Sequence, residues 1–463
     1  MMIPVFNPAD GSLVGQAPQH DTAQVLAAID RTVDAFAAWA ARLATERCDI
    51  LRRWLDLVRA DKQLFAELIT KENGKCLTEA LGEVAYGLGF IEWYAEEGKR
   101  IYGDTIPSHT IDGAIVVTRE PVGPVAAITP WNFPFMMITR KVATALAAGC
   151  TIVIKPSEET PLSAYKLLEY ARRAGIPAGV FEMVTGDPVV IGSLMTGDAR
   201  LRKLTFTGST AIGKLLARDC AANLKRVTME LGGNAPFIVF DDANLDAAAD
   251  GLVAAKLRNS GQVCISPNRV YVQAGIYDAF AAKVIERVAA LEVGQGLRPE
   301  SVVGPLINQK AVGKVDALVR QAHMAGADLA LGGKAHALGG MFYEPTVLLN
   351  VTDAMDVATT EIFGPVFPIY RFESEAEVVR RANDTEYGLV AYVYTRALGR
   401  SMRMSRAIES GMVIINSGSV GTASVPFGGV KQSGYGREGG YLGIEDYVEA
   451  KYVLFAGLMD GAD

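Results

Sequence analysis

Apolar positions over the first hundred residues of the chain recur with helical spacing. Within residues 21–43 they fall near one face of a helix, and Asp21 is placed to cap its N-terminus. More helix is predicted up to about residue 100. The pattern is interrupted at Asn73-Gly74, Gly87 and Gly89. We expect these helices to pack the fold and not to carry chemistry.

From residue 113 onward, short apolar runs alternate with helical segments. Strands are predicted at residues 113–120, 125–129, 151–155, 201–206, 237–240, 269–273, 345–349, 366–370, 389–395 and 412–415. Helices are predicted at residues 162–173, 244–258, 276–291, 374–383 and 399–410. This alternation predicts an α/β fold with parallel, doubly wound sheets. Residues 447–455 alternate like a strand, which we expect to pair with another subunit.

Length and composition limit the class of protein. A chain of 463 residues is too long for one simple core, so two or three domains are expected. No apolar run reaches 18 residues, and the N-terminus lacks the charged-then-apolar order of a secretory signal, so neither a membrane span nor export is predicted. The net charge is 45 − 52 = −7 and no basic run occurs, which argues against nucleic-acid binding.

The cysteine and histidine positions predict neither a metal site nor a disulfide framework. The five cysteines form no C-x-x-C pair, and none of the four histidines lies near a cysteine in the sequence. An odd number of cysteines without an export signal favours the reducing cytoplasm.

One cysteine, Cys264, follows the polar turn Asn259-Ser260-Gly261-Gln262 instead of lying in an apolar run. The alternative is a small core residue, which is what most lone cysteines are. Ser266 and Asn268 extend the polar setting, and an exposed polar loop with backbone donors can support a thiolate, the reactive form. Cys264 is therefore a candidate nucleophile.

Glu230 is a candidate general base. The glycines at 232 and 233 predict a turn, in which a buried side chain would be unusual. A carboxylate at the end of a strand can activate water. The alternative is a surface or salt-bridged glutamate.

Two loops that follow predicted strands are candidates for ligand contacts, because ligands gather at the C-terminal ends of strands in α/β sheets. In the aromatic loop at residues 130–134, Asn132 is either an amide donor or a turn residue. Residues 207–213 form a strand–glycine–helix junction whose free N–H groups suit a phosphate, although the motif is not G-x-G-x-x-G. The alternative there is a helix cap by Ser209 or Thr210.

Together these groups suit a reaction at a carbonyl carbon. A thiolate adds to the carbonyl, and Asn132 with a backbone N–H stabilises the oxyanion by roughly 3 kcal/mol for one donor. With a hydride acceptor nearby, the adduct collapses to a thioester, which water activated by a glutamate hydrolyses. Sequence spacing alone does not establish this set.

Seven motifs occur in one order along the chain. They are PWNFP at residues 130–134, IKPSE at 154–158, FTGS at 206–209, ELGGN at 230–234, GQVC at 261–264, EIFGP at 361–365 and PFGG at 426–429. In these motifs the chain resembles the NAD(P)-dependent aldehyde dehydrogenase superfamily over essentially its whole length.

The resemblance implies a fold of three parts and a homodimer or homotetramer. The parts are a Rossmann-like NAD-binding domain (1–106 and 122–231), an α/β catalytic domain (232–432) and a small β oligomerisation part (107–121 and 433–463).

The resemblance also implies catalytic roles. Cys264 matches the nucleophile, Glu230 the general base, and Asn132 with the Cys264 N–H the oxyanion hole. Lys141 and Glu438 match positions proposed as a proton relay in relatives. Because relatives that pass the acyl group to coenzyme A lack the base, Glu230 implies hydrolysis to the free acid.

A nicotinamide cofactor is implied as well. The matching contact residues are Thr129, Trp131, Lys155, Ser157, Glu158, Gly208, Ser209, Leu231, Glu361 and Phe363. A carboxylate at Glu158 accepts a hydrogen bond from the ribose 2′-hydroxyl but repels a 2′-phosphate, so we expect NAD to be preferred over NADP.

For the substrate, residues 90–107 and 137–141 resemble bacterial succinate-semialdehyde dehydrogenases, in which two arginines hold the distal carboxylate. The matching residues are Arg140 and Arg258, and the alternative for both is an ordinary helix-surface position. A guanidinium pairs with a carboxylate through two parallel hydrogen bonds, which gives the functional reading its physical basis.

Two positions depart from that group. Ser266 replaces a second cysteine able to form a regulatory disulfide. A serine that helps hold the carboxylate is replaced by Gly421 or Thr422, and Thr422 or Ser419 is the expected substitute. Succinate, glutarate and 2-oxoglutarate semialdehydes and other small anionic aldehydes therefore all stay open.

Two other functions also stay open. One is a dehydrogenase for neutral or amino aldehydes. The other is a non-catalytic member of the superfamily, against which the intact Cys264, Glu230 and Asn132 argue.

Overall fold

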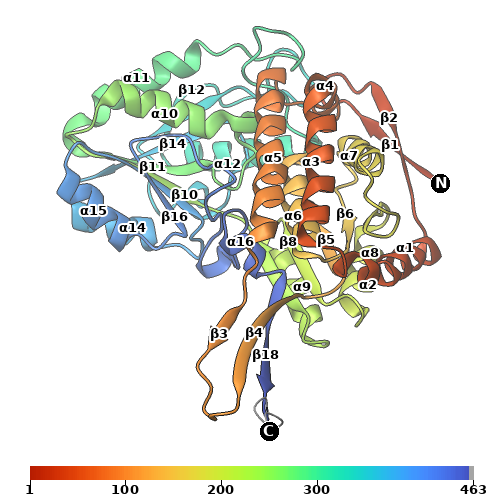
Figure 1. The fold of residues 1–463 in the computed structure, drawn as a ribbon. Helices are drawn as coiled ribbons and strands as arrows, with labels where there is room; N and C mark the ends of the chain where they lie inside the picture. The colour runs from red at the N-terminus through yellow and green to blue at the C-terminus, as the bar shows by residue number, and fades with distance from the viewer. Residues whose placement is uncertain (458–463) are drawn as a thin grey trace.

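Two mainly parallel sheets lie side by side in the computed structural model, which describes residues 1–457 (Figure 1). Helices cover the sheets, and a narrow three-stranded sheet projects below their junction. The α/β class predicted from the alternating pattern is confirmed.

The first sheet has the strand order β17-β9-β8-β5-β6-β7. Its strands are β5 (Val125–Ile128), β6 (Ile152–Lys155), β7 (Phe181–Met183), β8 (Lys203–Thr207), β9 (Arg226–Glu230) and β17 (Gly434–Tyr435). All neighbouring strands are parallel except β17 and β9. The C-terminal ends of β5, β6, β8 and β9 therefore meet at one edge, where the loops after them can share a ligand.

The helices of the first half of the chain precede or surround this sheet. They are α1 (Thr22–Asp34), α2 (Phe36–Ala40), α3 (Ala44–Ala60), α4 (Lys62–Asn73), α5 (Leu77–Glu97), α6 (Met136–Ala148), α7 (Leu162–Arg173), α8 (Pro188–Gly197) and α9 (Thr210–Ala221).

Two expectations about the helices are wrong. The single helix expected over residues 21–43 is two, α1 and α2, separated at Ala35, although Asp21 caps α1 as expected. Gly87 and Gly89 do not interrupt the helical pattern, because both lie inside α5. A Cβ at Gly87 would lie 2.5 Å from the Phe135 ring, so this glycine allows α5 to pack closely against the start of α6.

The second sheet has the order β12-β13-β14-β11-β10-β15-β16, and only β12 runs antiparallel to its neighbour. Its strands are β10 (Ala235–Val239), β11 (Pro267–Gln273), β12 (Asp328–Leu331), β13 (Thr346–Leu349), β14 (Val366–Phe372), β15 (Val390–Tyr394) and β16 (Met412–Ile415). The accompanying helices are α10 (Leu245–Leu257), α11 (Tyr277–Ala289), α12 (Gln309–Met324), α13 (Asp356–Thr359), α14 (Glu375–Asn383) and α15 (Leu398–Ala407).

The projecting sheet contains β3 (Asp104–Ile106), β4 (Ala114–Pro121) and β18 (Val448–Phe455), and the short helix α16 (Leu442–Glu445) precedes β18. The strand predicted over 447–455 is present, but its partner is β4 of the same chain, with Val448 opposite Pro121 and Phe455 opposite Ala114. The other edge of β18 has no strand beside it within residues 1–457.

The expected segment boundaries differ from the strand pairing at two points. β3 pairs with β4 although it was assigned to the cofactor domain, and β17 joins the first sheet although it was assigned to the oligomerisation part. These pairings join segments far apart in the chain, which a local pattern does not show. A separate hairpin, β1 (Met2–Phe6) with β2 (Leu13–Pro18), lies at the N-terminus.

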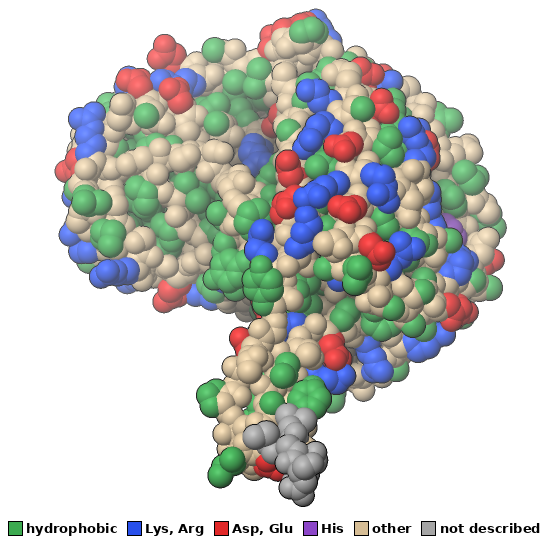
Figure 2. Space-filling view, in the orientation of Figure 1, with side chains coloured by type: hydrophobic (Ala, Val, Ile, Leu, Met, Phe, Trp, Pro, Cys, Tyr) green, Lys and Arg blue, Asp and Glu red, His purple; other side chains and the backbone are tan. Residues whose placement is uncertain are grey.

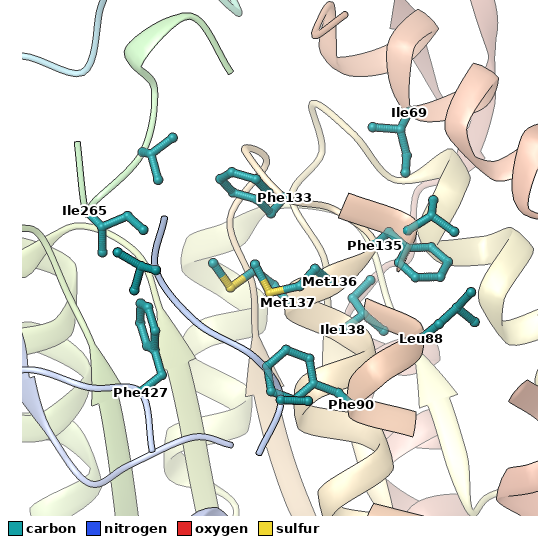
Figure 3. Packing of buried hydrophobic residues seen from close by; sticks show 14 of the residues in the cluster. Ile69, Leu88, Phe90, Phe133, Phe135, Met136, Met137, Ile138, Ile265 and Phe427 are labelled. Carbon is teal, nitrogen blue, oxygen red and sulfur yellow. The ribbon is translucent and has the colours of Figure 1, made fainter. Parts of the chain in front are cut away.

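The largest buried apolar cluster joins the helices to both sheets and surrounds α6. Figure 3 shows Phe135 and Ile138 packed towards Leu88 and Phe90 of α5. The Phe135 ring also meets the Phe65 ring edge-on, with centroids 5.3 Å apart. This packing holds α6 rigidly. In the part of the chain that the structure describes, no helix is both long and apolar enough to cross a membrane.

Candidate active site

Cys264 follows a left-handed turn between α10 and β11. Asn259, Ser260 and Gly261 have φ of 48°, 57° and 82°, a conformation that costs roughly 1–2 kcal/mol for each non-glycine residue. The Ser260 Oγ donates to the Gly304 carbonyl (2.9 Å), and a Cβ on Gly261 would lie 2.2 Å from the Gly364 carbonyl oxygen. Tertiary contacts therefore hold the strained turn and point the next residues at the cavity.

The polar neighbours of Cys264 do not form the exposed loop that the sequence predicted. Gln262, Ser266 and Asn268 are all buried. The Gln262 amide accepts from the Ile307 N–H, the Ser266 Oγ donates to the Lys256 carbonyl, and Asn268 accepts from Lys256. These side chains hold the loop in place, and among residues 261–270 only Cys264 is partly exposed.

The Cys264 thiol is neutral in the resting site. Burial, followed by the negative charges of Glu361 and Glu230, raises the pKa of this thiol to about 12. A reaction through the thiolate therefore needs a base to take the proton.

Glu230 is the last residue of β9 and lies on the wall of the cavity that Cys264 also lines. The expectation of an exposed turn residue is wrong, because β17 pairs with β9 and leaves the side chain only 2% exposed. Neither carboxylate oxygen has a hydrogen-bond partner within residues 1–457. Burial and then the charge of Glu438 raise the pKa of Glu230 well above its ordinary value. A buried carboxylate with a raised pKa and no partner is suited to take up a proton.

Glu438 lies between Lys141 and Arg140, both on α6. Lys141 Nζ donates to Glu438 Oε1 and, at 3.0 Å, to Thr205 Oγ1. Burial alone would raise the pKa of Glu438, but the charges of Arg140 and Lys141 together lower it.

Arg140 is buried and not on a helix surface. Its Nε lies 2.6 Å from Glu438 Oε2, close enough for an ion pair but without hydrogen-bond alignment. Its Nη1 has no hydrogen-bond partner in the described part of the chain. Because Glu438 already balances its charge, Arg140 is only partly available to a second carboxylate.

Asn132 lies in the loop after β5, beside the Cys264 loop. Its Nδ2 donates to the Gln262 carbonyl (3.0 Å), which leaves one N–H for a ligand, and Oδ1 has no partner among residues 1–457. The Cys264 backbone N–H likewise makes no hydrogen bond in that range. Asn132 and Cys264 line the same cavity, so their two free N–H groups are available to a ligand bound there.

A cavity of about 550 Å³ extends from Cys264 along the strand ends of the first sheet. Six of the predicted cofactor contacts line it: Trp131, Gly208, Ser209, Leu231, Glu361 and Phe363. Ser209 is the N-cap of α9 but makes no side-chain cap hydrogen bond, so the first N–H groups of this 12-residue helix stay free for an anion.

The far wall of this cavity comes from the second sheet. Phe363 has φ of 60°, rare for an aromatic residue, and its ring meets that of Trp131 edge-on at 5.7 Å. Glu361 accepts from the Gly233 N–H (3.1 Å), and burial raises the pKa of Glu361 to about 7. Flat apolar walls, a carboxylate and a free helix N-terminus fit a nicotinamide dinucleotide.

The other four predicted contacts do not line this cavity. Lys155 and Glu158 form an ion pair (2.6 Å), with the lysine buried and the carboxylate partly exposed. Thr129 and Ser157 are buried at the ends of β5 and β6, and the Thr129 hydroxyl has no partner among the described residues.

A narrow apolar passage leaves Cys264 on the opposite side. It encloses only about 20 Å³. Its lining includes Phe133, Met136, Met137, Ile265 and Phe427, which Figure 3 shows converging from α6 and the catalytic loops. The sequence reading assigned no role to these residues. Phe133 lies in the PWNFP motif and Phe427 in the PFGG motif, and these motifs were the only signal in the sequence for the two residues.

The passage opens into an outer cavity of about 640 Å³, and Arg258 lines both spaces. Figure 2 shows a hollow between the two halves of the molecule with basic side chains inside it. Arg258 stacks on Phe133, 5.4 Å from the ring centroid. Arg258 forms no salt bridge within residues 1–457, although Glu79 lines the same outer cavity and the charge of Arg258 opposes the rise that burial causes in the pKa of that carboxyl group, so the arginine charge is only partly offset.

The two polar residues expected to assist the arginines lie on the loop before PFGG. Ser419 is exposed and lines the outer cavity, whereas Thr422 is exposed, lines neither space and contacts the Ser424 hydroxyl (3.3 Å). Val420, which lines both spaces, was missed in the sequence because an apolar residue in a glycine-rich loop gives no signal.

Comparison with known proteins is consistent with this geometry. Residues 1–453 match the Aldehyde dehydrogenase family. The chain is 52% identical to a glutarate-semialdehyde dehydrogenase of Pseudomonas aeruginosa, over 98% of this chain and 94% of that protein. It is also 52% identical to the NADP(+) succinate-semialdehyde dehydrogenase GabD of Escherichia coli, over 97% and 94%. The crystal structure of succinate-semialdehyde dehydrogenase from Burkholderia pseudomallei superposes with a TM-score of 0.97 at 53% identity, covering 98% of this chain and 95% of that one. The chain belongs to the aldehyde dehydrogenase family.

Proposed function

We propose that the protein oxidises a small aldehyde that carries a distal carboxylate, such as succinate or glutarate semialdehyde, to the free acid. The observation that carries this proposal is the position of Cys264 between two spaces: a cavity that fits a dinucleotide, and a passage that ends at the unpaired Arg258. The test is reduction of NAD by the purified protein with a panel of anionic, neutral and amino aldehydes.

The first chemical step forms a covalent adduct on Cys264. The thiol proton passes to solvent water in the cavity, and the sulfur adds to the aldehyde carbon, so that Glu230 stays free for the second step. The remaining Asn132 N–H and the Cys264 backbone N–H stabilise the oxyanion. A nicotinamide dinucleotide, when bound, supplies the hydride acceptor that turns this adduct into a thioester.

Glu230 completes the reaction. Its carboxylate takes a proton from water, and the resulting hydroxide attacks the thioester, releases the acid and regenerates the thiol. Glu438 raises the proton affinity of Glu230 and is itself paired with Lys141. We propose that Glu438 and Lys141 pass the proton onward from Glu230.

Arg258 is proposed to hold the distal carboxylate. Replacing it with alanine should weaken binding of the anionic aldehyde by roughly 2 kcal/mol, about thirtyfold, with little change for propanal. The measurement is KM and kcat/KM for both aldehydes. Propanal, which has no carboxylate, is the internal control. Equal losses of kcat/KM for both aldehydes would show that Arg258 does not hold the carboxylate.

NAD is the proposed cofactor, in preference to NADP, because the carboxylate of Glu158 suits a free 2′-hydroxyl. The relative GabD is named for NADP(+), so the preference needs measurement. We expect a higher kcat/KM with NAD than with NADP, and Glu158→Gln, which removes the charge that repels a 2′-phosphate, should raise kcat/KM for NADP by about tenfold, or about 1.4 kcal/mol. A higher kcat/KM with NADP in the unaltered protein would contradict the assignment.

A homodimer or homotetramer is proposed from the projecting sheet. β18 keeps one free edge within the described chain and exposes Tyr452 and Phe455. Light scattering coupled to size-exclusion chromatography gives the mass, and a monomer would overturn this part of the proposal.

A further inference from the structure

The loop Asn73-Gly74-Lys75 between α4 and α5 lies directly behind the active-site loop at 131–132. The Asn73 amide donates to the Trp131 carbonyl (3.1 Å), and Lys75 Nζ donates to the Asn132 carbonyl (2.7 Å). Two successive carbonyls of the site are therefore held by side chains from one distant loop. Gly74 has φ of 91°, and a Cβ there would lie 2.7 Å from Pro305, so the loop depends on this glycine.

Lys75 is buried, and its ammonium group has three close partners. It is 1% exposed, its Nζ lies 2.6 Å from Glu83 Oε2, and the ammonium sits 3.9 Å from the centre of the Phe133 ring. Glu83 in turn accepts from the N–H groups of Phe135 and Met136, where α6 begins. The lysine thus ties the Asn132 loop to the N-terminus of α6.

A second group reaches the same carbonyl from the catalytic loop. Asn259 Nδ2 donates to the Asn132 carbonyl (3.1 Å), and its backbone N–H donates to both carboxylate oxygens of Glu79 (2.9 and 3.1 Å). The Asn132 side chain donates back to Gln262 (3.0 Å). Asn132 is therefore fixed from the α4–α5 side and from the Cys264 side together, and Lys75 provides the only charged donor among these bonds.

We propose that Lys75 is a positioning residue for the oxyanion hole, which it serves by holding the backbone of Asn132 through the Lys75–Glu83 pair. The inference rests on the proposed role of Asn132. Lys75 lines the outer cavity but not the dinucleotide cavity, so its loss should lower kcat through Asn132 and leave cofactor affinity unchanged.

The test compares Lys75→Met with Lys225→Met. Lys225 is a buried lysine outside the site whose Nζ donates to two backbone carbonyls, those of Asp198 and Leu201, where Lys75 donates to one. We expect K75M to lose about 10²-fold in kcat, the effect of one lost oxyanion donor, with KM for NAD within twofold of the unaltered protein. K225M should keep its kcat. If K75M does not fold, K75M/E83Q removes both charges while the side-chain amide oxygen at position 83 can still accept from α6, and the same loss is expected.

A double-mutant cycle with Asn132→Ala identifies the route of the effect. If Lys75 acts through Asn132, K75M should cost less than threefold further in the N132A background. If the losses in kcat caused by K75M and N132A multiply in the double mutant, the inference is overturned. It is also overturned if K75M only raises KM for the anionic aldehyde, because Lys75 would then be a substrate contact. Loss of activity in N132A with full kcat in K75M would overturn the Lys75 inference alone, whereas full activity in N132A would overturn the proposed oxyanion hole.

Discussion

Replacing Cys264 with alanine is expected to abolish aldehyde oxidation while leaving dinucleotide binding intact. The sulfur is the only group proposed to bond to the substrate, and no other cysteine lines either space at the site. Loss of the nucleophile costs on the order of 10⁶-fold in kcat in a serine protease, which also forms an acyl-enzyme. The cofactor contacts come from α9 and the loops around Trp131 and Glu361, which the substitution does not touch.

The measurement is NAD reduction together with NAD binding by calorimetry. Cys48→Ala serves as the matched control, because Cys48 is fully buried in α3 and lines none of the three described spaces at the site. It should lose stability and keep kcat. Oxidation by C264A above background would show that the cysteine is not the nucleophile, and loss of NAD binding in C264A would mean that the substitution disturbs the cofactor cavity.

Local patterns were enough to predict most of the α/β framework. Helix α7 begins and ends where the sequence placed it, at Leu162 and Arg173, and the cap of α10 by Asn244 is present. The ends of α7 and the cap of α10 depend on residues within one helical turn of each other, so a local sequence pattern is enough to predict them. The strands β5, β6 and β8 of the first sheet were also predicted, because they are short apolar runs next to glycine or proline, whereas β9, which ends in Glu230, was not. The short β7 and the polar α12 lack such a signal and were missed.

The environment of the candidate site was less predictable, since it depends on chain segments far apart. Glu230 was expected on an exposed turn, but β17, two hundred residues later, pairs with its strand and buries it. Arg140 was expected either on a helix surface or free to bind substrate, yet Glu438 lies against it. The partners of Asn73 were likewise invisible, so that pair was read as a mere helix interruption. Motifs thus pointed to candidate site residues, while the partners of those residues and the shifts in their pKa values came only from the fold.

Glu230→Gln is expected to stop the reaction after the first half. The amide matches the carboxylate in size but cannot accept a proton, so the thioester on Cys264 should form and then persist. We expect a burst of one reduced cofactor per active site, followed by turnover about 10³-fold slower than that of the unaltered protein. Rapid-mixing absorbance gives the burst, and mass spectrometry of the quenched protein should detect the acyl group on Cys264.

The pH dependence supplies an independent check on the same residue. The pKa of Glu230 is raised. As the pH falls through this raised pKa, a smaller fraction of Glu230 is ionised and able to accept a proton. Hydrolysis of the thioester in the unaltered protein should therefore slow at low pH. E230Q should lose this dependence. The control is Glu72→Gln. Burial also raises the pKa of Glu72, in its case to about 7, but this carboxylate only accepts from Leu162 and Ser163 at the start of α7. E72Q should show no burst. If E230Q keeps full steady-state turnover, Glu230 is not the base of the hydrolytic step.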